Sequence, residues 1–295
     1  MQFTVNVQDL LEGLNTVTRA LAARPPKQIL EGVLIEADDL DQYEDDELLV
    51  MTTGSQGEEM SALYRMAFST HKQVDIGAGD KVAILSQSMP NWSVAFFSIV
   101  PFGRIAIPIL PDSSENEVTN IINHSESKVL FVSQRLIGKV SQEVKDKMTL
   151  IFDLDTFEML KSDDDKFTCD GRTTNPTPDD IATIIYTSGT TGSAKGVVLS
   201  HRNLSSNVIT CYHSCKRTEK DRWLSVLPMA HTLEMTLSML YPMYCGATVY
   251  YLPKPPVASL LMKALKIVKP TTMLTVPMII EKVYKGSVLP TIKKS

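Results

Sequence analysis

Short apolar runs alternate with amphipathic segments over most of the chain. From about residue 79 onward, four β-rich runs occur in order: KVAILS, IAIPIL, KVLFVS and TLIFDL. Two segments between them, NWSVAFFSIV and ENEVTNIINHS, place apolar residues at helical spacing. Strands that alternate with helices are typical of a doubly wound, mostly parallel sheet. The pattern therefore predicts an α/β fold with a largely parallel, doubly wound sheet.

The first 78 residues follow a different pattern and divide into two regions. Residues 1–38 predict a strand (MQFTVNV), a helix (QDLLEGLNTVTRAL) and a second strand (ILEGVLIEA), with Pro25-Pro26 breaking the chain after the helix. Eight of the twelve residues 36–47 are acidic, which predicts a solvated face or a linker. A strand (LLVMTTG) and a helix (EEMSALYRMAF) follow. We therefore expect three regions: residues 1–38, 39–78 and 79–295.

Composition narrows the class of protein. The chain has 295 residues, of which 43% are hydrophobic and 21% charged, so most of it is expected to be globular. A formal net charge of −5 disfavours a general nucleic-acid binder, which needs a basic surface. Four cysteines are too few and too unevenly spaced for a disulfide scaffold, no secretory signal opens the chain, and no apolar run reaches transmembrane length. These features predict a reduced, cytoplasmic protein.

A stretch rich in glycine, serine and threonine, YTSGTTGSAKGVVLSH, covers Tyr186–His201. The apolar run IATIIYTS leads into this stretch and predicts a buried strand. We expect a helix to begin after SHRN. Glycines permit tight turns and close approach of the backbone, while N–H groups and hydroxyls can donate to phosphate oxygens. Lys195 adds a positive charge. The stretch is therefore predicted to bind phosphate groups.

Two other interpretations of this stretch were open. A Walker A loop needs the pattern G-x-x-x-x-G-K-[ST], but here Ala194 precedes Lys195 and Gly196 follows it. No hydroxyl therefore follows the lysine to hold Mg²⁺. The other alternative is a glycine-rich turn without a ligand, which so long a run of small polar residues disfavours.

The motif YTSGTTGSAKGVVLSHRNL resembles the phosphate-loop signature of the adenylate-forming superfamily, which includes acyl-CoA synthetases, luciferases and peptide-synthetase adenylation domains. Two later stretches agree with it. WLSVLPMAHTLEMT, Trp223–Thr236, resembles the family's LPLAH element, and PTTMLTVPMIIEKVY, Pro270–Tyr284, resembles a segment of long-chain fatty acyl-CoA synthetases. The resemblance covers about residues 79–295. It implies the N-terminal part of the family's α/β fold, with stacked, mostly parallel sheets and flanking helices.

The resemblance implies a reaction in two steps. A carboxylate attacks the α-phosphate of Mg·ATP to give an acyl-adenylate and pyrophosphate, and a thiol, usually coenzyme A, then displaces AMP. ATP, Mg²⁺ and coenzyme A are therefore expected, with a medium- or long-chain fatty acid as the acid and an amino or aryl acid as the alternative. The residues that the resemblance assigns to the β- and γ-phosphates are Thr187, Ser188, Gly189, Thr190, Thr191, Gly192 and Lys195.

The same resemblance makes His231, in LPMAH, the candidate catalytic residue, because the family places it between the acyl pocket and the adenylate. Glu234 has two interpretations: a direct role in the site, or an exposed carboxylate at a helix end. The stretch CYHSC, residues 211–215, suggests metal ligands, but two cysteines on a core helix are favoured. His124 is expected on the surface at a helix end, and the Met-rich stretch MLYPMY in the core.

The first two regions resemble other families. Residues 1–38 resemble the N-terminal edge of a bacterial DNA polymerase III sliding clamp β subunit, and residues 39–82 resemble a β-CASP fragment of ribonuclease J with its TTGSQGE turn. Neither fragment carries its parent's function, because a clamp needs complete repeated domains and the nuclease needs an H-x-H-x-D-H metal motif. We favour a chimeric chain with joins near Asp38 and Lys81. A divergent N-terminus and a non-enzymatic DNA-replication clamp-like module are the alternatives.

The family resemblance also implies later elements that this sequence does not contain. They are a G-Y-G-x-T-E stretch whose Glu helps to hold Mg²⁺, an Asp for the ribose, a hinge, and a small domain with a catalytic Lys. The metal ligand is therefore expected in the missing half. We expect a domain truncated at its C-terminal side, with exposed apolar surface and little or no complete turnover. Small-molecule substrates are the expected partners, with no nucleic acid, no obligate protein partner, and at most peripheral membrane contact of the intact enzyme.

Overall fold

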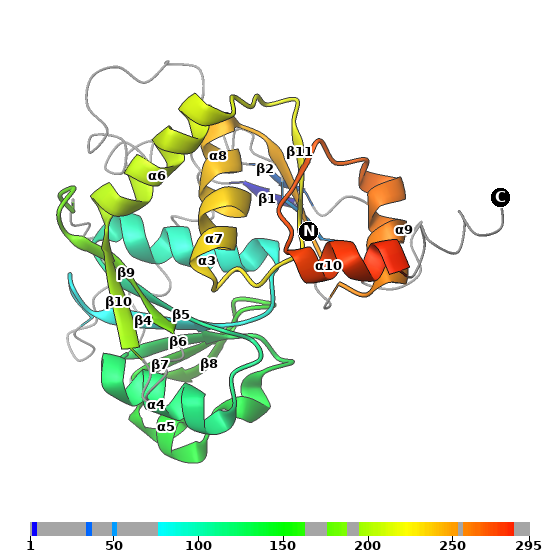
Figure 1. Cartoon of the computed structure of the whole chain (residues 1–295). Helices are drawn as coiled ribbons and strands as arrows, with labels where there is room; N and C mark the ends of the chain where they lie inside the picture. Colours follow the sequence, from blue (N-terminus) through cyan, green and yellow to red (C-terminus); the bar gives the residue numbers. More distant parts are fainter. Residues whose placement is uncertain are drawn as a thin grey trace, which may run out of the picture.

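The computed structural model describes residues 2–4, 34–36, 49–51, 76–162, 176–187, 195–252 and 256–285. Within them the chain forms a seven-stranded sheet, a four-stranded sheet and a two-stranded ribbon, with helices packed between and around the two larger sheets (Figure 1). The predicted α/β fold of stacked, mostly parallel sheets with flanking helices is confirmed.

The seven-stranded sheet has the strand order β10-β9-β5-β4-β6-β7-β8. Its central strands run parallel, whereas the edge strands β10 and β8 are antiparallel to their neighbours. Each of the four predicted apolar runs forms one of the central strands. The strands are β4 (Lys81–Leu85), β5 (Ile105–Ile109), β6 (Val129–Val132), β7 (Leu150–Asp153), β8 (Met159–Ser162), β9 (Ile181–Thr187) and β10 (Lys195–Ser200).

Helices cover both faces of this sheet. Figure 1 shows α4 and α5 on one side of it and α3 on the other. Short 3-10 turns at Val100–Phe102 and Ile137–Lys139 lie in the connections. The predicted helices NWSVAFFSIV and ENEVTNIINHS are confirmed as α3 and α4. The helices are α3 (Pro90–Ile99), α4 (Glu115–Ser125), α5 (Gln142–Lys147) and α6 (His201–Ser214).

The central strands are buried on both faces, as a parallel sheet covered by helices requires. Along β4, Val82 and Ile84 belong to the hydrophobic cluster that contains α3 side chains. Ala83 and Leu85 point the other way, into the cluster with α4 and α5 side chains. All four are fully buried, which explains why KVAIL reads as an unbroken apolar run.

The four-stranded sheet has the order β13-β11-β12-β3. Strand β11 is parallel to β12 and β13, and β3 is antiparallel to β12. The region 39–78 thus contributes an edge strand to a sheet built from later residues. Figure 1 shows α9 and α10 beside this sheet. The elements are β3 (Leu49–Met51), β11 (Arg222–Ser225), β12 (Thr248–Tyr251), β13 (Thr272–Met273), α9 (Ala258–Val268) and α10 (Pro277–Val283).

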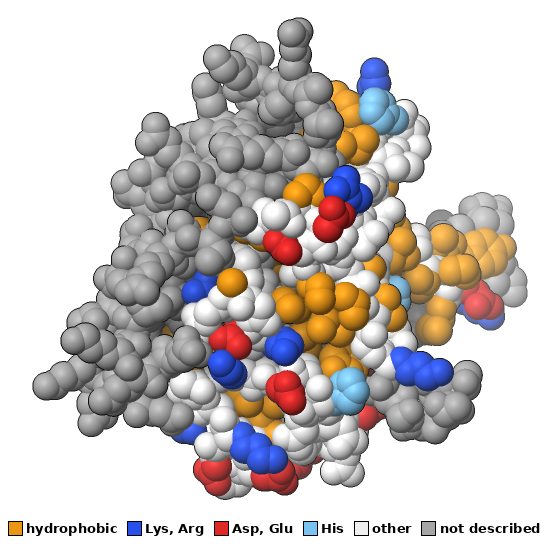
Figure 2. Space-filling view, turned by 90° about the vertical axis from the view of Figure 1, so that its left-hand side faces the viewer, with side chains coloured by type: hydrophobic (Ala, Val, Ile, Leu, Met, Phe, Trp, Pro, Cys, Tyr) orange, Lys and Arg blue, Asp and Glu red, His pale blue; other side chains and the backbone are white. Residues whose placement is uncertain are grey.

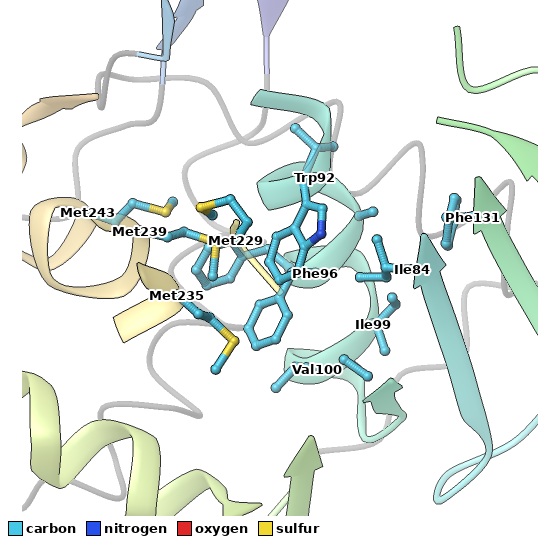
Figure 3. Packing of buried hydrophobic residues seen from close by; sticks show 14 of the residues in the cluster. Ile84, Trp92, Phe96, Ile99, Val100, Phe131, Met229, Met235, Met239 and Met243 are labelled. Carbon is cyan, nitrogen blue, oxygen red and sulfur yellow. The ribbon is translucent and has the colours of Figure 1, made fainter. Parts of the chain in front are cut away.

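A methionine-rich helical segment packs against α3 between the two larger sheets. It consists of α7 (Thr232–Glu234), a π-helical turn (Met235–Leu240) and α8 (Tyr241–Cys245). Met239 and Met243 are buried, so the prediction that MLYPMY lies in the core is confirmed. Figure 3 shows the methionine side chains turned toward two aromatic rings of α3. The labelled side chains at this contact are Trp92, Phe96, Met229, Met235, Met239 and Met243.

The first region contributes β1 (Gln2–Thr4) and β2 (Leu34–Glu36), which pair antiparallel. The two strands predicted there are confirmed. The predicted helix QDLLEGLNTVTRAL, the acidic run after Glu36 and the predicted helix EEMSALYRMAF lie outside the described residues. Within the part of the chain that the structure describes, no helix is both long and apolar enough to cross a membrane.

The second half of the phosphate-binding stretch differs from its prediction. The expected helix after SHRN begins three residues earlier than predicted, at His201 instead of Leu204, and a strand, β10, precedes it. The β-branched pair Val197-Val198 favours that strand. Ser200 then starts α6 as its N-cap, because its hydroxyl accepts the Asn203 N–H at 3.2 Å and the Asn203 side chain accepts the Ser200 N–H at 2.9 Å. Residues 188–194 of the stretch therefore connect two antiparallel strands, β9 and β10, and not a strand and a helix.

Candidate phosphate site and adjoining pocket

Two residues that flank positions 188–194 of the phosphate-binding stretch lie opposite each other. Thr187 ends β9, Lys195 begins β10, and the two residues are partners in the antiparallel ladder. Both side chains are exposed, and Lys195 forms no ion pair with any residue that the structure describes. A hydroxyl and an ammonium group without an ion-pair partner among the described residues thus lie on paired residues at the carboxyl end of β9. The other predicted residues, Ser188, Gly189, Thr190, Thr191 and Gly192, lie outside the described residues.

The strands that carry these two ends are packed closely. Gly196 lies opposite Tyr186, and a Cβ atom on Gly196 would come 2.8 Å from Cγ2 of Ile184. The missing side chain therefore lets β10 lie against the side chains of β9. The Tyr186 hydroxyl is 2.7 Å from Nδ1 of His124, which is exposed at the end of α4. The surface position predicted for His124 is confirmed, and its ring ties α4 to the strand that leads into the stretch.

The first residue of α6, His201, directly follows β10 and is buried. Its N–H donates to the Asp180 carbonyl at 3.1 Å, but neither ring nitrogen has a hydrogen-bond partner among the described residues. Burial lowers the pKa of His201, and the nearby Asp180 carboxylate opposes this only in part. The imidazole is therefore neutral at pH 7 and offers no positive charge to an anion.

A pocket of about 310 Å³ opens at the carboxyl ends of strands from both larger sheets. Residues that follow β4, β5 and β6 form one side, and residues that follow β11 and β12 form the other. This is the edge where parallel α/β sheets bind ligands, and β9 ends at the same edge of its sheet. The pocket is lined by Gln87, Ser88, Pro111, Asp112, Arg135, Leu136, Val226, Leu227, Pro228, Leu252 and Pro256.

His231 lies on the loop after β11, at the N-terminal end of α7. Its N–H donates to the Pro228 carbonyl at 2.9 Å, and Nδ1 accepts the Leu233 N–H at 3.3 Å. In the neutral ring this leaves the proton on Nε2. The side chain is exposed, so Nε2 is available to a ligand as a donor. His231 itself does not line the pocket, but its loop does, through Val226 to Pro228.

Glu234 is buried, so the interpretation as an exposed helix-end carboxylate is wrong. Its Oε1 accepts the Ser225 hydroxyl at 2.6 Å, the Val226 N–H at 3.1 Å and the Leu227 N–H at 3.3 Å. Burial raises the pKa of Glu234 to about 7, although the hydrogen bonds from Ser225, Leu227 and Val226 act in the opposite direction. A carboxyl in such a place is either a structural anchor or part of a functional site.

The two cysteines of the CYHSC stretch lie in different surroundings. Cys211 is half-buried on α6, whereas Cys215 lies just past the helix end and is exposed. The expectation of two cysteines on a core helix thus holds for the first only, because α6 ends at Ser214. Cys169 lies outside the described residues. Within the described part of the chain, no group of three or more histidine, cysteine or acidic side chains is placed to hold a metal ion.

The structure brings some predicted site residues together and not others. Thr187 and Lys195 face each other across one hairpin, while His231 lies on the loop that follows β11, a strand of the other sheet. The sequence analysis missed Ser88, whose hydroxyl donates to the Leu227 carbonyl at 2.9 Å and accepts the Met229 N–H at 3.1 Å. No local motif marks this serine. Glu234 carries a weak signal, since it follows LPMAH within the same element.

Two family models match the sequence. The model described as AMP-binding enzyme matches residues 65–294, and the model of the ribonuclease J beta-CASP domain matches residues 25–100. The second match supports the β-CASP resemblance over a wider range than the predicted residues 39–82. The two matches overlap at residues 65–100. This overlap contains β4, a strand of the seven-stranded sheet, and α3, a helix that packs against that sheet. The sliding-clamp resemblance, the chimeric origin and the three-region division stay predictions.

Known proteins agree with the first match. The chain is 30% identical over 224 residues to long-chain-fatty-acid–CoA ligase FadD15 of Mycobacterium bovis, covering 71% of this chain and 36% of that one. It is 28% identical over 229 residues to long chain acyl-CoA synthetase 6, peroxisomal, of Arabidopsis thaliana, covering 72% and 32%. The AMP complex of O-succinylbenzoate coenzyme A synthetase from Bacillus subtilis shares the fold, with a TM-score of 0.65, 22% identity, and coverage of 83% of this chain and 60% of that one. The chain spans about a third of the length of these curated relatives.

Proposed function

Because this chain belongs to the AMP-binding enzyme family, we propose that it takes part in the ATP-dependent activation of a carboxylic acid. The proposed reaction joins the acid to AMP with release of pyrophosphate, and then transfers the acyl group to the thiol of coenzyme A. The described residues supply the phosphate-binding and acid-orienting parts of the first step.

One observation carries this proposal. Thr187 and Lys195, which flank positions 188–194 of the glycine-rich stretch, are paired opposite each other at the carboxyl end of β9. An exposed ammonium group without an ion-pair partner among the described residues suits the charge of a triphosphate. Phosphoryl and adenylyl transfer demand positioning and charge stabilisation more than covalent chemistry from the protein. Lys195 supplies charge there, and Thr187 supplies a hydroxyl donor.

We assign to His231 the orientation of the substrate carboxylate. Its exposed Nε2–H can donate to a carboxylate oxygen, while Nδ1 is held by the Leu233 N–H. A donor fixed in this way favours one approach of the carboxylate toward the α-phosphate. Mg²⁺ would accompany the triphosphate, but the described residues contain no cluster of metal ligands, so we assign it no protein ligand.

The names of the relatives favour a fatty acid as the substrate. FadD15 is named a long-chain-fatty-acid–CoA ligase, and the Arabidopsis thaliana protein a long chain acyl-CoA synthetase. We therefore propose a medium- or long-chain fatty acid. An amino acid or an aryl acid is the competing outcome.

Stable mimics of the acyl-adenylate test this proposal without turnover. Binding of palmitoyl, phenylalanyl and salicyl sulfamoyl-adenosine to the full chain would be measured by isothermal titration calorimetry. The proposal expects the palmitoyl compound to bind tightest and His231→Ala to weaken it. Preference for an amino or aryl compound would overturn the substrate class. Absence of binding by all three compounds and by Mg·ATP would overturn the function.

A further inference from the structure

The loop that carries His231 is fixed by hydrogen bonds from two side chains that belong to different parts of the fold. This loop, residues 226–231, connects β11 to α7 and forms part of the pocket wall. Glu234 accepts the N–H groups of Val226 and Leu227. From the connection between β4 and α3, the Ser88 hydroxyl donates to the Leu227 carbonyl and accepts the Met229 N–H. Two side chains thus hold four backbone groups of one short loop.

We propose that Glu234 is a positioning residue, whose carboxyl fixes the 226–231 loop and thereby sets the place of His231 and of the pocket wall. The inference rests on the proposed function for the role of His231, but not for the fixing of the loop. Glu234 does not line the pocket itself but binds the N–H groups of Val226 and Leu227, which do, so it acts through the loop.

The geometry closes a short ring of contacts. Glu234 holds the start of the loop, and the loop ends at His231, whose carbonyl accepts the Met235 N–H at 3.0 Å. His231 also receives the Leu233 N–H on its ring. The first turn after the loop therefore binds both its beginning and its end. A shift of the Glu234 carboxyl moves the donors that define the loop's path, and the imidazole moves with them.

The surroundings of Glu234 indicate what the site requires of its side chain. The groups that shift its pKa are the hydroxyls of Ser225 and Ser238 and two backbone amides, and none of them is a cation. The buried Tyr251 lies near enough for the Glu234 charge to act on it, and its own hydroxyl pairs with Ser93 at 3.0 Å. Neither Oε2 of Glu234 nor the Ser238 hydroxyl has a hydrogen bond of normal geometry.

These surroundings favour an uncharged acceptor. A buried carboxylate without a cation is costly, whereas a neutral group that accepts through Oε1 and donates toward Ser238 would satisfy the unpaired hydroxyl. A glutamine meets both needs, because its carbonyl oxygen accepts and its amide group donates. The proposal thus predicts that Glu234→Gln keeps the loop in place and that Glu234→Leu, of similar size, releases it.

Amide hydrogen exchange with residue-level fragmentation tests the proposal on the full chain. In E234L, the Val226 and Leu227 amides should exchange about tenfold to a hundredfold faster, as the loss of a strong hydrogen bond implies. The Leu252 amide is the internal control, because it donates to the Ser225 carbonyl at 3.0 Å and not to Glu234. E234Q should leave all three amides close to wild type. The His231 imidazole signal in a histidine-labelled sample should move in E234L and not in E234Q.

The outcomes separate this proposal from the proposed function. Unchanged Val226 and Leu227 exchange in E234L, or an equal loss of protection in E234Q, would overturn the positioning role. If E234L does not fold, Glu234→Asp replaces it, since a carboxyl one methylene shorter cannot hold the same donors. Binding of palmitoyl sulfamoyl-adenosine, measured in parallel, should weaken in E234L and recover in E234Q. If the wild type binds no mimic, the proposed function fails while the exchange result still decides the positioning role.

Discussion

His124 and Tyr186 join the end of a surface helix to the strand that leads into the phosphate-binding stretch. Nδ1 of His124 lies 2.7 Å from the Tyr186 hydroxyl, and the two rings meet edge to face with centroids 5.6 Å apart. Burial raises the pKa of Tyr186, so its hydroxyl stays protonated at neutral pH. The contact anchors the end of β9 next to Thr187.

Removal of that hydroxyl should loosen the anchor. Tyr186→Phe keeps the ring but loses the hydrogen bond, which should cost about 1 kcal/mol of unfolding free energy. Urea denaturation of the two proteins measures the difference. Tyr284→Phe is the control, because Tyr284 is exposed beyond the end of α10 and its substitution should change nothing. Equal stability of Y186F and the wild type would show that the contact adds nothing.

The close packing at Gly196 makes a second prediction. A Cβ atom there would meet Cγ2 of Ile184 at 2.8 Å, and this methyl group sits on a stiff β-branched side chain. Gly196→Ala should therefore destabilise the protein by roughly 1–3 kcal/mol. The double variant G196A/I184A should recover part of that loss, because the clashing methyl group is gone. Thermal unfolding of the three proteins measures this, and failure of the second substitution to help would refute the steric explanation.

The raised pKa of Glu234 predicts how stability depends on pH. Between its ordinary value of 4.5 and its value of about 7 in the protein, the folded state keeps a proton that the unfolded chain has lost. The contribution of Glu234 to the unfolding free energy should therefore fall as pH rises through this window, by ~3 kcal/mol at most, and level off above it.

The wild type and Glu234→Gln isolate this effect, because other titrating groups are common to both. The difference in their unfolding free energies in urea, measured from pH 4.5 to 8, should shift steadily in favour of E234Q. Glu219→Gln, at an exposed position, should show no such trend. A difference that does not change with pH would mean that Glu234 has an ordinary pKa.

Some elements of the fold could be predicted from the sequence, and others could not. The helix ENEVTNIINHS matches α4, Glu115–Ser125, because its apolar spacing and its Ser114–Glu117 capping box are local features. Strand β10 was not predicted, because VVLS is short and its antiparallel pairing with β9 is not a feature of local spacing. The burial of Glu234 was not predicted either, because it depends on the packing of α7 between two sheets, which local spacing does not encode.

Exposed apolar side chains on β10 suggest a route to self-association. Val197 is 46% exposed and Val198 53%, on an edge strand of the seven-stranded sheet. Figure 2 shows hydrophobic side chains gathered on a face of the molecule. Edge strands with apolar side chains pair readily with other chains, and a lysine there opposes such pairing. Val198→Lys should therefore lower the sedimentation-derived mass of concentrated samples. Met278→Lys, at an exposed position on α10, is the comparison. If only M278K lowers the mass, the self-association involves α10 and not β10.

The most direct test of the central claim is the binding of Mg·ATP to the chain before and after loss of Lys195. Isothermal titration calorimetry would compare the wild type with Lys195→Ala and with Lys266→Ala, which removes an exposed lysine on α9. Loss of a charged hydrogen bond to phosphate should weaken binding by about tenfold to a hundredfold in K195A. K266A should bind like the wild type. Equal affinity in all three proteins, or no binding in any, would contradict a phosphate site at the hairpin of β9 and β10.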